Sequence, residues 1–511
     1  MRRLRAAVLV AVTTIALLPS APASAGTTPT IVNPGFESDA GWSQLGAVAS
    51  AFTEAGGHSG AARLTHWAGT AYRVDTVQRV TGLRRGTYTL RAWVRSSGGQ
   101  RAAELTLTGC GGPSRQVPLP RTGPEWWVQL VLSVPVERGG CTIGVHSDAA
   151  AGQWVNVDDV TFTRGPAAGR VDIQGADVSQ LLKNEQHGAV YRDAHGRRDD
   201  ALRILQSNGV NYLRLKVWVD PADGYSDRDD VLLVARRAKA LGLKLLVDFH
   251  YSDAWADPGK QNKPAAWAGL DFEHLRQAVY EHTYGMLAAL RAQHTPADMA
   301  QIGNEINGGM LWPDGRWDNW DGLAALLTAG STAVKAASPS TRVVLHLAEG
   351  GNNGGHVWWF DNAIARGVPF DVIAVSQYLY WHGPLGYLQA NLFDLATRYD
   401  KDVMVAETAY GFTTAEQDAE PNIFTPALAD AGGYPATPQG QSDALRDMFN
   451  AVAAGPGGHG LGVFYWEPTW TAVAGGGWDP ADPSSGDGWE NQALFDYTGR
   501  ALPALRIFGQ F

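Results

Sequence analysis

The run Tyr212-Leu213-Arg214-Leu215-Lys216-Val217 and the two segments after it set the fold class of this 511-residue chain. The run is short and mostly apolar, as expected of a strand in a buried sheet. Residues 228–241 then place apolar side chains at helical spacing. A second strand-like run follows in Lys244-Leu245-Leu246-Val247-Asp248-Phe249. Strand, helix and strand in this order indicate a parallel βαβ unit and therefore an α/β protein.

The same alternation recurs from about residue 170 to the end of the chain, with further helix-like segments at 272–292 and 385–399. Eight expected strands are the number that closes a (β/α)8 TIM barrel, which we predict for residues 171–511. An open, doubly wound sheet is the alternative. No G-x-G-x-x-G follows the first strand, so a dinucleotide site has no support. The expected strands are 173–178, 212–217, 244–249, 299–304, 343–347, 372–377, 402–407 and 462–467.

Residues 27–163 have a different pattern, with short alternating runs such as 88–94 and 127–132 separated by glycine-rich turns. No helical period is sustained there. This pattern predicts an all-β, jelly-roll-like sandwich that precedes the barrel. Residues 164–170 have the composition of a linker.

Residues 1–25 are typical of an export signal, with a basic start, an apolar run and an Ala23-Ser24-Ala25 cleavage site. We therefore expect a secreted, extracellular protein, with an N-terminal membrane anchor as the alternative. The cysteines Cys110 and Cys141 would then meet an oxidising compartment, which favours a disulfide over two unpaired thiols. The formal net charge of −10 argues against nucleic acid as a partner and suits a neutral substrate. No later segment has the roughly 20 apolar residues of a membrane helix.

Polar side chains stand at the C-terminal end of every expected barrel strand, where the active sites of such barrels form. Glycoside hydrolysis needs two carboxyl groups that flank the scissile bond. Glu305 and Glu407 end the fourth and seventh strands, which face each other across a barrel mouth. We predict Glu305 as the general acid/base and Glu407 as the nucleophile of a retaining β-glycosidase. A strand-end salt bridge is the alternative for either glutamate alone.

Two neighbours support these roles. Arg214 is placed to hold Glu407 ionised, because a guanidinium lowers the pKa of a nearby carboxylate, while Glu305 must stay protonated. The alternative for Arg214 is a structural ion pair. Asn304, directly before Glu305, can hydrogen-bond the sugar 2-hydroxyl. This chemistry needs no cofactor.

At these residues the chain from about 172 to 511 resembles glycoside hydrolase family 53, the arabinogalactan endo-β-1,4-galactanases of clan A. The specific match is His250-Tyr251-Ser252-Asp253-Ala254-Trp255-Ala256-Asp257-Pro258-Gly259-Lys260-Gln261, followed by Pro264 and Trp267. The Asn-Glu pair alone is shared by all of clan A. Supporting pieces are 175–179, 211–218, 303–306, 407–410 and 491–496.

The resemblance implies hydrolysis of internal β-1,4-galactosidic bonds of galactan or type I arabinogalactan, with retention. We separately expect a monomer. The family's acid/base and nucleophile map onto Glu305 and Glu407. Other clan A activities, such as β-mannanase or xylanase, and a catalytically silent polysaccharide-binding protein remain the alternatives. Six residues are assigned to substrate contact, with packing behind the site as the alternative: Asp177, His250, Asp253, His346, Tyr378 and Trp466.

Bacterial members of the family can carry a calcium ion that bridges the loops after the seventh and eighth strands. Oxygen-rich loops suit such a hard cation, although the spacing here departs from the family's site. The ligands expected for this structural calcium are Asp418, Asn422, Asp482, Ser484 and Asp487.

The N-terminal part resembles β-sandwich carbohydrate-binding modules in Asn33-Pro34-Gly35-Phe36-Glu37 and Val157-Asp158-Asp159-Val160. A purely structural sandwich is the alternative. Five aromatic residues are candidate sugar platforms: Trp42, Trp67, Tyr72, Trp126 and Trp154.

Overall fold

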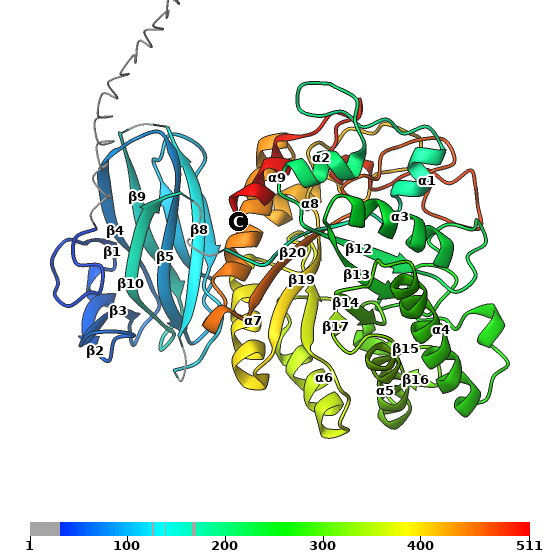
Figure 1. The fold of residues 1–511 in the computed structure, drawn as a ribbon. Coiled ribbons are helices and arrows are strands. Elements are labelled where there is room, and N and C mark those ends of the chain that lie inside the picture. Colours follow the sequence, from blue (N-terminus) through cyan, green and yellow to red (C-terminus); the bar gives the residue numbers. More distant parts are fainter. Residues whose placement is uncertain (1–30, 125–126, 138, 166–169) are drawn as a thin grey trace, which may run out of the picture.

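The computed structural model describes residues 31–124, 127–137, 139–165 and 170–511, and it contains a β-sandwich beside a larger α/β barrel (Figure 1). The expected export signal, Trp126 and the middle of the expected linker lie outside the described residues. Within the described part of the chain, no helix is both long and apolar enough to cross a membrane.

The sandwich consists of two antiparallel five-stranded sheets, ordered β1-β4-β9-β6-β7 and β2-β3-β10-β5-β8. Side chains alternate between core and surface along the strands, which buries one face of each sheet against the other. A disulfide joins Cys110 to Cys141, as predicted, and ties the turn after β6 to β9. The strands are β1 (Ser43–Gly46), β2 (Ala51–Ala55), β3 (Ala62–Trp67), β4 (Tyr72–Leu83), β5 (Gly86–Ser96), β6 (Ala102–Thr108), β7 (Arg115–Pro118), β8 (Val128–Val136), β9 (Gly139–Ala149) and β10 (Trp154–Arg164).

The second part is a closed barrel of parallel strands, so the predicted fold class is confirmed. Neighbouring strands pair in parallel around the ring, and β11 closes it against β20. The barrel strands are β11 (Ile173–Asp177), β12 (Tyr212–Val217), β13 (Lys244–Phe249), β14 (Met299–Ile302), β17 (Arg342–Leu347), β18 (Val372–Ser376), β19 (Asp402–Thr408) and β20 (Gly460–Trp466). A short hairpin of β15 (Gly309–Met310) and β16 (Gly315–Arg316) follows β14.

Helices cover the outside of the barrel, and several begin at an aspartate or asparagine that caps the first turn. Asp271, for example, accepts a hydrogen bond from the backbone N–H of His274 at the start of α4. The helices are α1 (Leu181–Gln186), α2 (Ala201–Ser207), α3 (Arg228–Ala240), α4 (Phe272–Ala292), α5 (Trp320–Ala337), α6 (Asn353–Ala365), α7 (Leu385–Tyr399), α8 (Pro426–Gly432) and α9 (Pro438–Ala453).

The alternation of side chains along β12 shows how the barrel positions a site. Leu213 and Leu215 point outward and pack with the helices. Tyr212 lies in a small separate apolar cluster inside the barrel, which includes Leu246 and Phe464. Arg214, two residues further along, stands above this apolar layer. This apolar cluster therefore fills one end of the barrel interior, and the polar residues lie at the other end, where the strands have their carboxyl ends.

The sandwich packs against α7 and α9 of the barrel (Figure 1). Arg115 of β7 forms an ion pair with Asp443 of α9, and both side chains are nearly buried. Asn450 donates a hydrogen bond of 2.8 Å to Ser133 of β8. Ala390 of α7 belongs to the apolar core cluster of the sandwich. The two parts therefore share a packed and charged interface.

Candidate active site

A cavity of about 660 Å³ opens at the carboxyl ends of the barrel strands. It lies where the polar strand ends had been expected to converge. Glu305, Glu407, Arg214 and Asn304 all line it. The same cavity contains Asp177, His250, Tyr378 and Trp466 of the six predicted substrate contacts.

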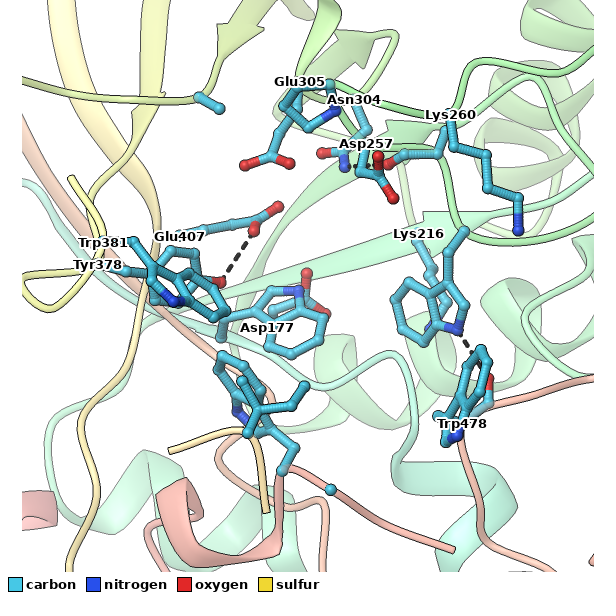
Figure 2. Close-up of a pocket in the computed structure, with 18 of the residues that line it drawn as sticks. Asp177, Lys216, Asp257, Lys260, Asn304, Glu305, Tyr378, Trp381, Glu407 and Trp478 are labelled. Atoms are coloured by element: carbon cyan, nitrogen blue, oxygen red, sulfur yellow. Dashed lines mark hydrogen bonds between the residues drawn. The ribbon is translucent and has the colours of Figure 1, made fainter. Parts of the chain in front are cut away.

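Glu407 on β19 is buried and held by two neighbours (Figure 2). Its Oε1 lies 2.9 Å from Nη2 of Arg214, and Tyr378 donates its hydroxyl to Oε2 at 3.0 Å. Arg214 also contacts Asp177 at 2.7 Å and Asp248 at 2.8 Å. One guanidinium thus contacts three carboxylates inside the barrel. Burial by itself lowers the pKa of Arg214, but the three carboxylates raise it above its ordinary value, so the group stays charged.

Glu305 reaches the cavity through an irregular turn directly after β14. Gly303 has φ 81° and Glu305 itself has φ 48°, a left-handed conformation that is costly for a residue with a side chain. The strand ends at Ile302 rather than at Asn304 because this turn interrupts the pairing. The turn aims the carboxyl group of Glu305 at the space above Glu407 (Figure 2).

Burial raises the pKa of both glutamates, and the two differ in their direct contact with Arg214. Burial, opposed by a side-chain hydrogen bond from Ser376, raises the pKa of Glu305 to about 7. Burial also raises the pKa of Glu407, Arg214 opposes that rise, and the charge of Glu305 adds to it. Repulsion between two nearby carboxylates favours a single shared proton near neutral pH. The guanidinium of Arg214 lowers the pKa of both glutamates, and it contacts Glu407 directly, which favours the ionised form of that residue.

Asn304 is fixed by its own hydrogen bonds beside the two glutamates. Its Oδ1 accepts from Nη2 of Arg214 at 2.8 Å, and its Nδ2 donates to the backbone carbonyl of Ala256 at 2.8 Å. An amide nitrogen carries two N–H groups. The second N–H of Asn304 is therefore available for a hydroxyl group in the cavity.

Two of the predicted substrate contacts do not line the cavity. The carboxylate of Asp253 accepts hydrogen bonds from the backbone N–H groups of Asp220 and Ala265, so it ties loops together. His346 is fully buried behind Asn304, with its Nδ1 3.0 Å from Oδ1 of that residue. Burial lowers the pKa of His346 far below its ordinary value, so the ring is neutral.

Aromatic side chains from the loops form much of the cavity wall, and the sequence did not single most of them out. Trp255 stacks on Trp470 and donates its indole N–H to the carbonyl of Trp478 at 2.7 Å. Trp381 and Trp478 are 48% and 43% exposed, which is unusual for indoles and suits stacking on sugar faces. The cavity-lining tryptophans are Trp255, Trp381, Trp466, Trp470, Trp478 and Trp489. Trp466 had been predicted as a substrate contact and Trp255 lies in the run that carries the family resemblance; for the others the chain offered only its 19 tryptophans as a signal.

The predicted calcium ligands are not supported as a metal site. No group of three or more His, Cys, Asp and Glu side chains in the described part of the chain could hold a metal ion. Asp418 instead accepts hydrogen bonds from the backbone N–H groups of Glu420 and Asp487, and Asp482 bonds Ser484 within its own turn. Asn422 donates to the carbonyl of Ala415. Backbone N–H groups thus bond both oxygens of Asp418, whereas Oδ1 of Asn422 and Oδ2 of Asp487 are buried without a hydrogen-bond partner in the described structure.

A closed barrel with two buried carboxyl groups that face a tryptophan-lined cavity is the arrangement expected of a glycoside hydrolase. The comparison with family models then narrows the class. A model described as Glycosyl hydrolase family 53 matches residues 173–508. The chain belongs to this family, and the family resemblance noted in the sequence is confirmed.

Relatives of known activity match most of their own length. An endo-β-1,4-galactanase of Bacillus subtilis (strain 168) is 37% identical over 370 residues, covering 66% of this chain and 85% of its own. An arabinogalactan endo-β-1,4-galactanase of Thermothelomyces thermophilus is 34% identical over 343 residues, covering 66% and 98%. The solved catalytic domain of the family 53 enzyme of Ignisphaera aggregans has 44% identity and a TM-score of 0.65, covering 67% and 98%.

Proposed function

We propose that this protein is a retaining endo-β-1,4-galactanase that cleaves internal bonds of galactan and type I arabinogalactan. The observation that carries the proposal is the pairing of Glu407 with Arg214 in the cavity that Glu305 also lines, in a barrel of family 53. The relatives named above are endo-β-1,4-galactanases, which supports galactan as the substrate.

The proposed reaction is a double displacement. Glu407 attacks the anomeric carbon as Glu305 gives its proton to the departing glycosidic oxygen, which leaves a covalent galactosyl–Glu407 ester. Glu305, now ionised, takes a proton from water, and that water releases the sugar with retained configuration. The remaining N–H of Asn304 would hold the 2-hydroxyl of the reacting galactose. The Tyr378 hydroxyl keeps the carboxylate of Glu407 oriented before attack.

Reducing-sugar release from unbranched β-1,4-galactan, compared with mannan and xylan, tests the substrate. Hydrolysis of galactan with little release from the other two is expected. Strong cleavage of mannan or xylan without cleavage of galactan would favour another clan A activity. Binding of galactan without hydrolysis would favour a silent polysaccharide-binding protein. Following the products by NMR separates retention, which gives the β-anomer first, from inversion.

We also propose that the β-sandwich, predicted as residues 27–163, binds carbohydrate. Trp67 at the end of β3 is 45% exposed, and it lies directly across the sheet from the half-buried Trp154 of β10. Two indoles side by side offer a platform for sugar faces. Trp42 and Tyr72, two of the other candidates, are buried in the described structure and are not available as platforms. In affinity gel electrophoresis, galactan in the gel should retard migration of the parent protein, and Trp67→Ala should remove this retardation. The buried Trp42 is left unchanged in that variant.

Export is proposed from residues 1–25 alone, and the enzyme is proposed to act extracellularly as a monomer. N-terminal sequencing of protein from culture medium should begin near Gly26. Protein that stays with the cell membrane and keeps its first residues would favour the anchor instead. Sedimentation or light scattering of the secreted protein measures its oligomeric state.

A further inference from the structure

Lys216 is a buried cation of the active-site cavity that the reaction described above does not use. It follows Arg214 by two residues on β12, so both side chains point into the barrel, and Lys216 stands nearer its mouth. Its side chain is 2% exposed. Burial lowers the pKa of Lys216, and the carboxylates of Glu467 and Asp177 oppose that change.

The ammonium group of Lys216 has charged and aromatic neighbours but makes no hydrogen bond within the described structure. Its Nζ lies 4.0 Å from the ring centre of Trp255 and 4.8 Å from that of Trp218. The nearest paired carboxylate oxygen, Oε1 of Glu467, is 3.8 Å away, which is too far for a hydrogen bond. An ammonium has three N–H donors, and leaving them unpaired in a buried site is costly.

Lys216 lies on one side of the cavity. Its strand β12 and the strand β20, which precedes Glu467, both pair with β11 and flank Asp177. Figure 2 shows Lys216 on the other side of Asp177 from Glu407, and away from Glu305. Since Glu305 protonates the departing sugar, the sugars on the Lys216 side belong to the part of the chain that stays on the enzyme.

We propose that Lys216 determines substrate binding by donating a hydrogen bond to a hydroxyl group of galactose on this retained side of the cleavage point. A sugar hydroxyl supplies the acceptor that the ammonium lacks. The neighbouring Trp255 offers an aromatic face for the same sugar, so the pair combines one polar contact with one apolar surface. This inference rests on the proposed galactanase function.

A purely structural role for Lys216 makes a different prediction. In that case the lysine serves only to balance the buried carboxylate of Glu467, whose own oxygens accept the backbone N–H of Gln180. Lys216→Met would then act by leaving Glu467 uncompensated. The double variant Lys216→Met/Glu467→Gln, which removes both charges, would bind substrate as well as Glu467→Gln alone.

The test measures binding of β-1,4-galacto-oligosaccharides by calorimetry to the full chain silenced by Glu305→Gln. Adding Lys216→Met should weaken binding about tenfold to hundredfold, the range for a hydrogen bond with a charged partner. Lys216→Met/Glu467→Gln should bind the oligosaccharide at least about tenfold more weakly than Glu467→Gln. This difference should persist even if the melting temperature of the double variant equals that of the parent. Lys244→Met is the matched control, since Lys244 also lies over a ring, that of Tyr212, but at the opposite end of the barrel. It should bind like the parent.

A ligand series identifies the hydroxyl. The series consists of oligosaccharides with a 2-, 3- or 6-deoxy galactose on the retained side. For one of them, loss of the hydroxyl should weaken binding to the parent about tenfold but change binding to Lys216→Met by less than about twofold. Equal binding by Lys216→Met and its parent, or recovery of binding in the double variant, would overturn the proposal. If the active protein cleaves mannan or xylan instead of galactan, the proposed function fails first, and that result is separate from the behaviour of Lys216.

Discussion

At the scale of single residues, the site depends on three carboxylates that share the one guanidinium of Arg214. Asp177, Asp248 and Glu407 all contact this one guanidinium. Asp248 has further partners in His250 and Gln301, whereas Glu407, among the described residues, is held by the hydroxyl of Tyr378 and the arginine. Glu407 is thus the least committed of the three carboxylates, which suits a group that must leave its partners and attack carbon.

Glu407→Ala should abolish turnover of galactan, because no carboxylate remains to form the glycosyl intermediate. Added azide should restore part of the activity on an activated aryl galactoside and give the α-galactosyl azide. NMR of the product shows its configuration. Asp253→Ala, which alters a loop carboxylate outside the cavity, is the comparison and should keep measurable turnover without azide. Undiminished activity of Glu407→Ala would contradict the nucleophile assignment.

The pH dependence follows from the raised pKa of Glu305. Protonated Glu305 is the acid, so it is available below its pKa of about 7 and lost above it. The value of kcat/KM on galactan should therefore fall as pH rises through about 7, by up to about tenfold per pH unit. Glu305→Ala should remove this alkaline limb on an aryl galactoside with a good leaving group, which needs no protonation. A limb that persists in that variant would assign it to another group.

That Glu305 and Glu407 line one cavity could be predicted from the sequence, because both stand near strand ends and strand ends converge in any such barrel. The tryptophan wall could not, because Trp381, Trp478 and Trp489 come from loops whose course has no periodic signal. Asp253 and His346 fail as cavity residues for a related reason. A polar strand end predicts nearness to the site, but hydrogen bonds behind the wall decide which side chains reach the cavity.

At the scale of elements, apolar runs located the barrel strands closely. The predicted strands 212–217 and 244–249 coincide with β12 and β13, and the predicted helix 272–292 with α4. The difference at β14, which ends at Ile302, arises from the positive φ of Gly303. A side chain on Gly303 would have its Cβ 2.6 Å from Ile306, so both the conformation and the space require glycine there.

The disulfide is the element-scale feature most open to measurement. Cys110 and Cys141 are 31 residues apart and buried, and their bond restricts the unfolded chain of the sandwich. Replacing both by serine should lower the free energy of unfolding of the sandwich by about 2–4 kcal/mol. Denaturant titration with and without reductant measures the loss. A reductant effect that persists in the double variant would mean that the disulfide is not its source.

At the scale of the whole molecule, the contact between sandwich and barrel could not have been predicted. Arg115 is 328 residues from its partner Asp443, and Asn450 is 317 residues from its partner Ser133. No local sequence pattern links residues that far apart. For the junction of the two parts, the sequence showed only the linker-like composition of 164–170. The described structure instead has the ion pair of Arg115 and Asp443 almost fully enclosed at the interface.

Arg115→Ala should loosen this contact. Breaking a buried ion pair costs about 3–5 kcal/mol, and Arg446, which also contacts Asp443, should keep the loss near the lower end. Calorimetry of Arg115→Ala should show the sandwich and the barrel unfolding in transitions that are further apart in temperature than those of the parent. Arg101→Ala removes an exposed pair with Asp148 on the sandwich and should change stability far less than Arg115→Ala, because solvent screens exposed pairs. Identical traces for Arg115→Ala and its parent would show that the ion pair does not hold the parts together.

The packed interface also changes what the peptide connection between the two parts has to do. If contacts across α7, α9 and β8 supply the association, an intact backbone between residues 165 and 170 is not required for it. We expect a protease cut in that segment to leave a two-chain enzyme that migrates as one particle. Produced as separate polypeptides, the two parts should assemble as the subunits of a heterodimer do.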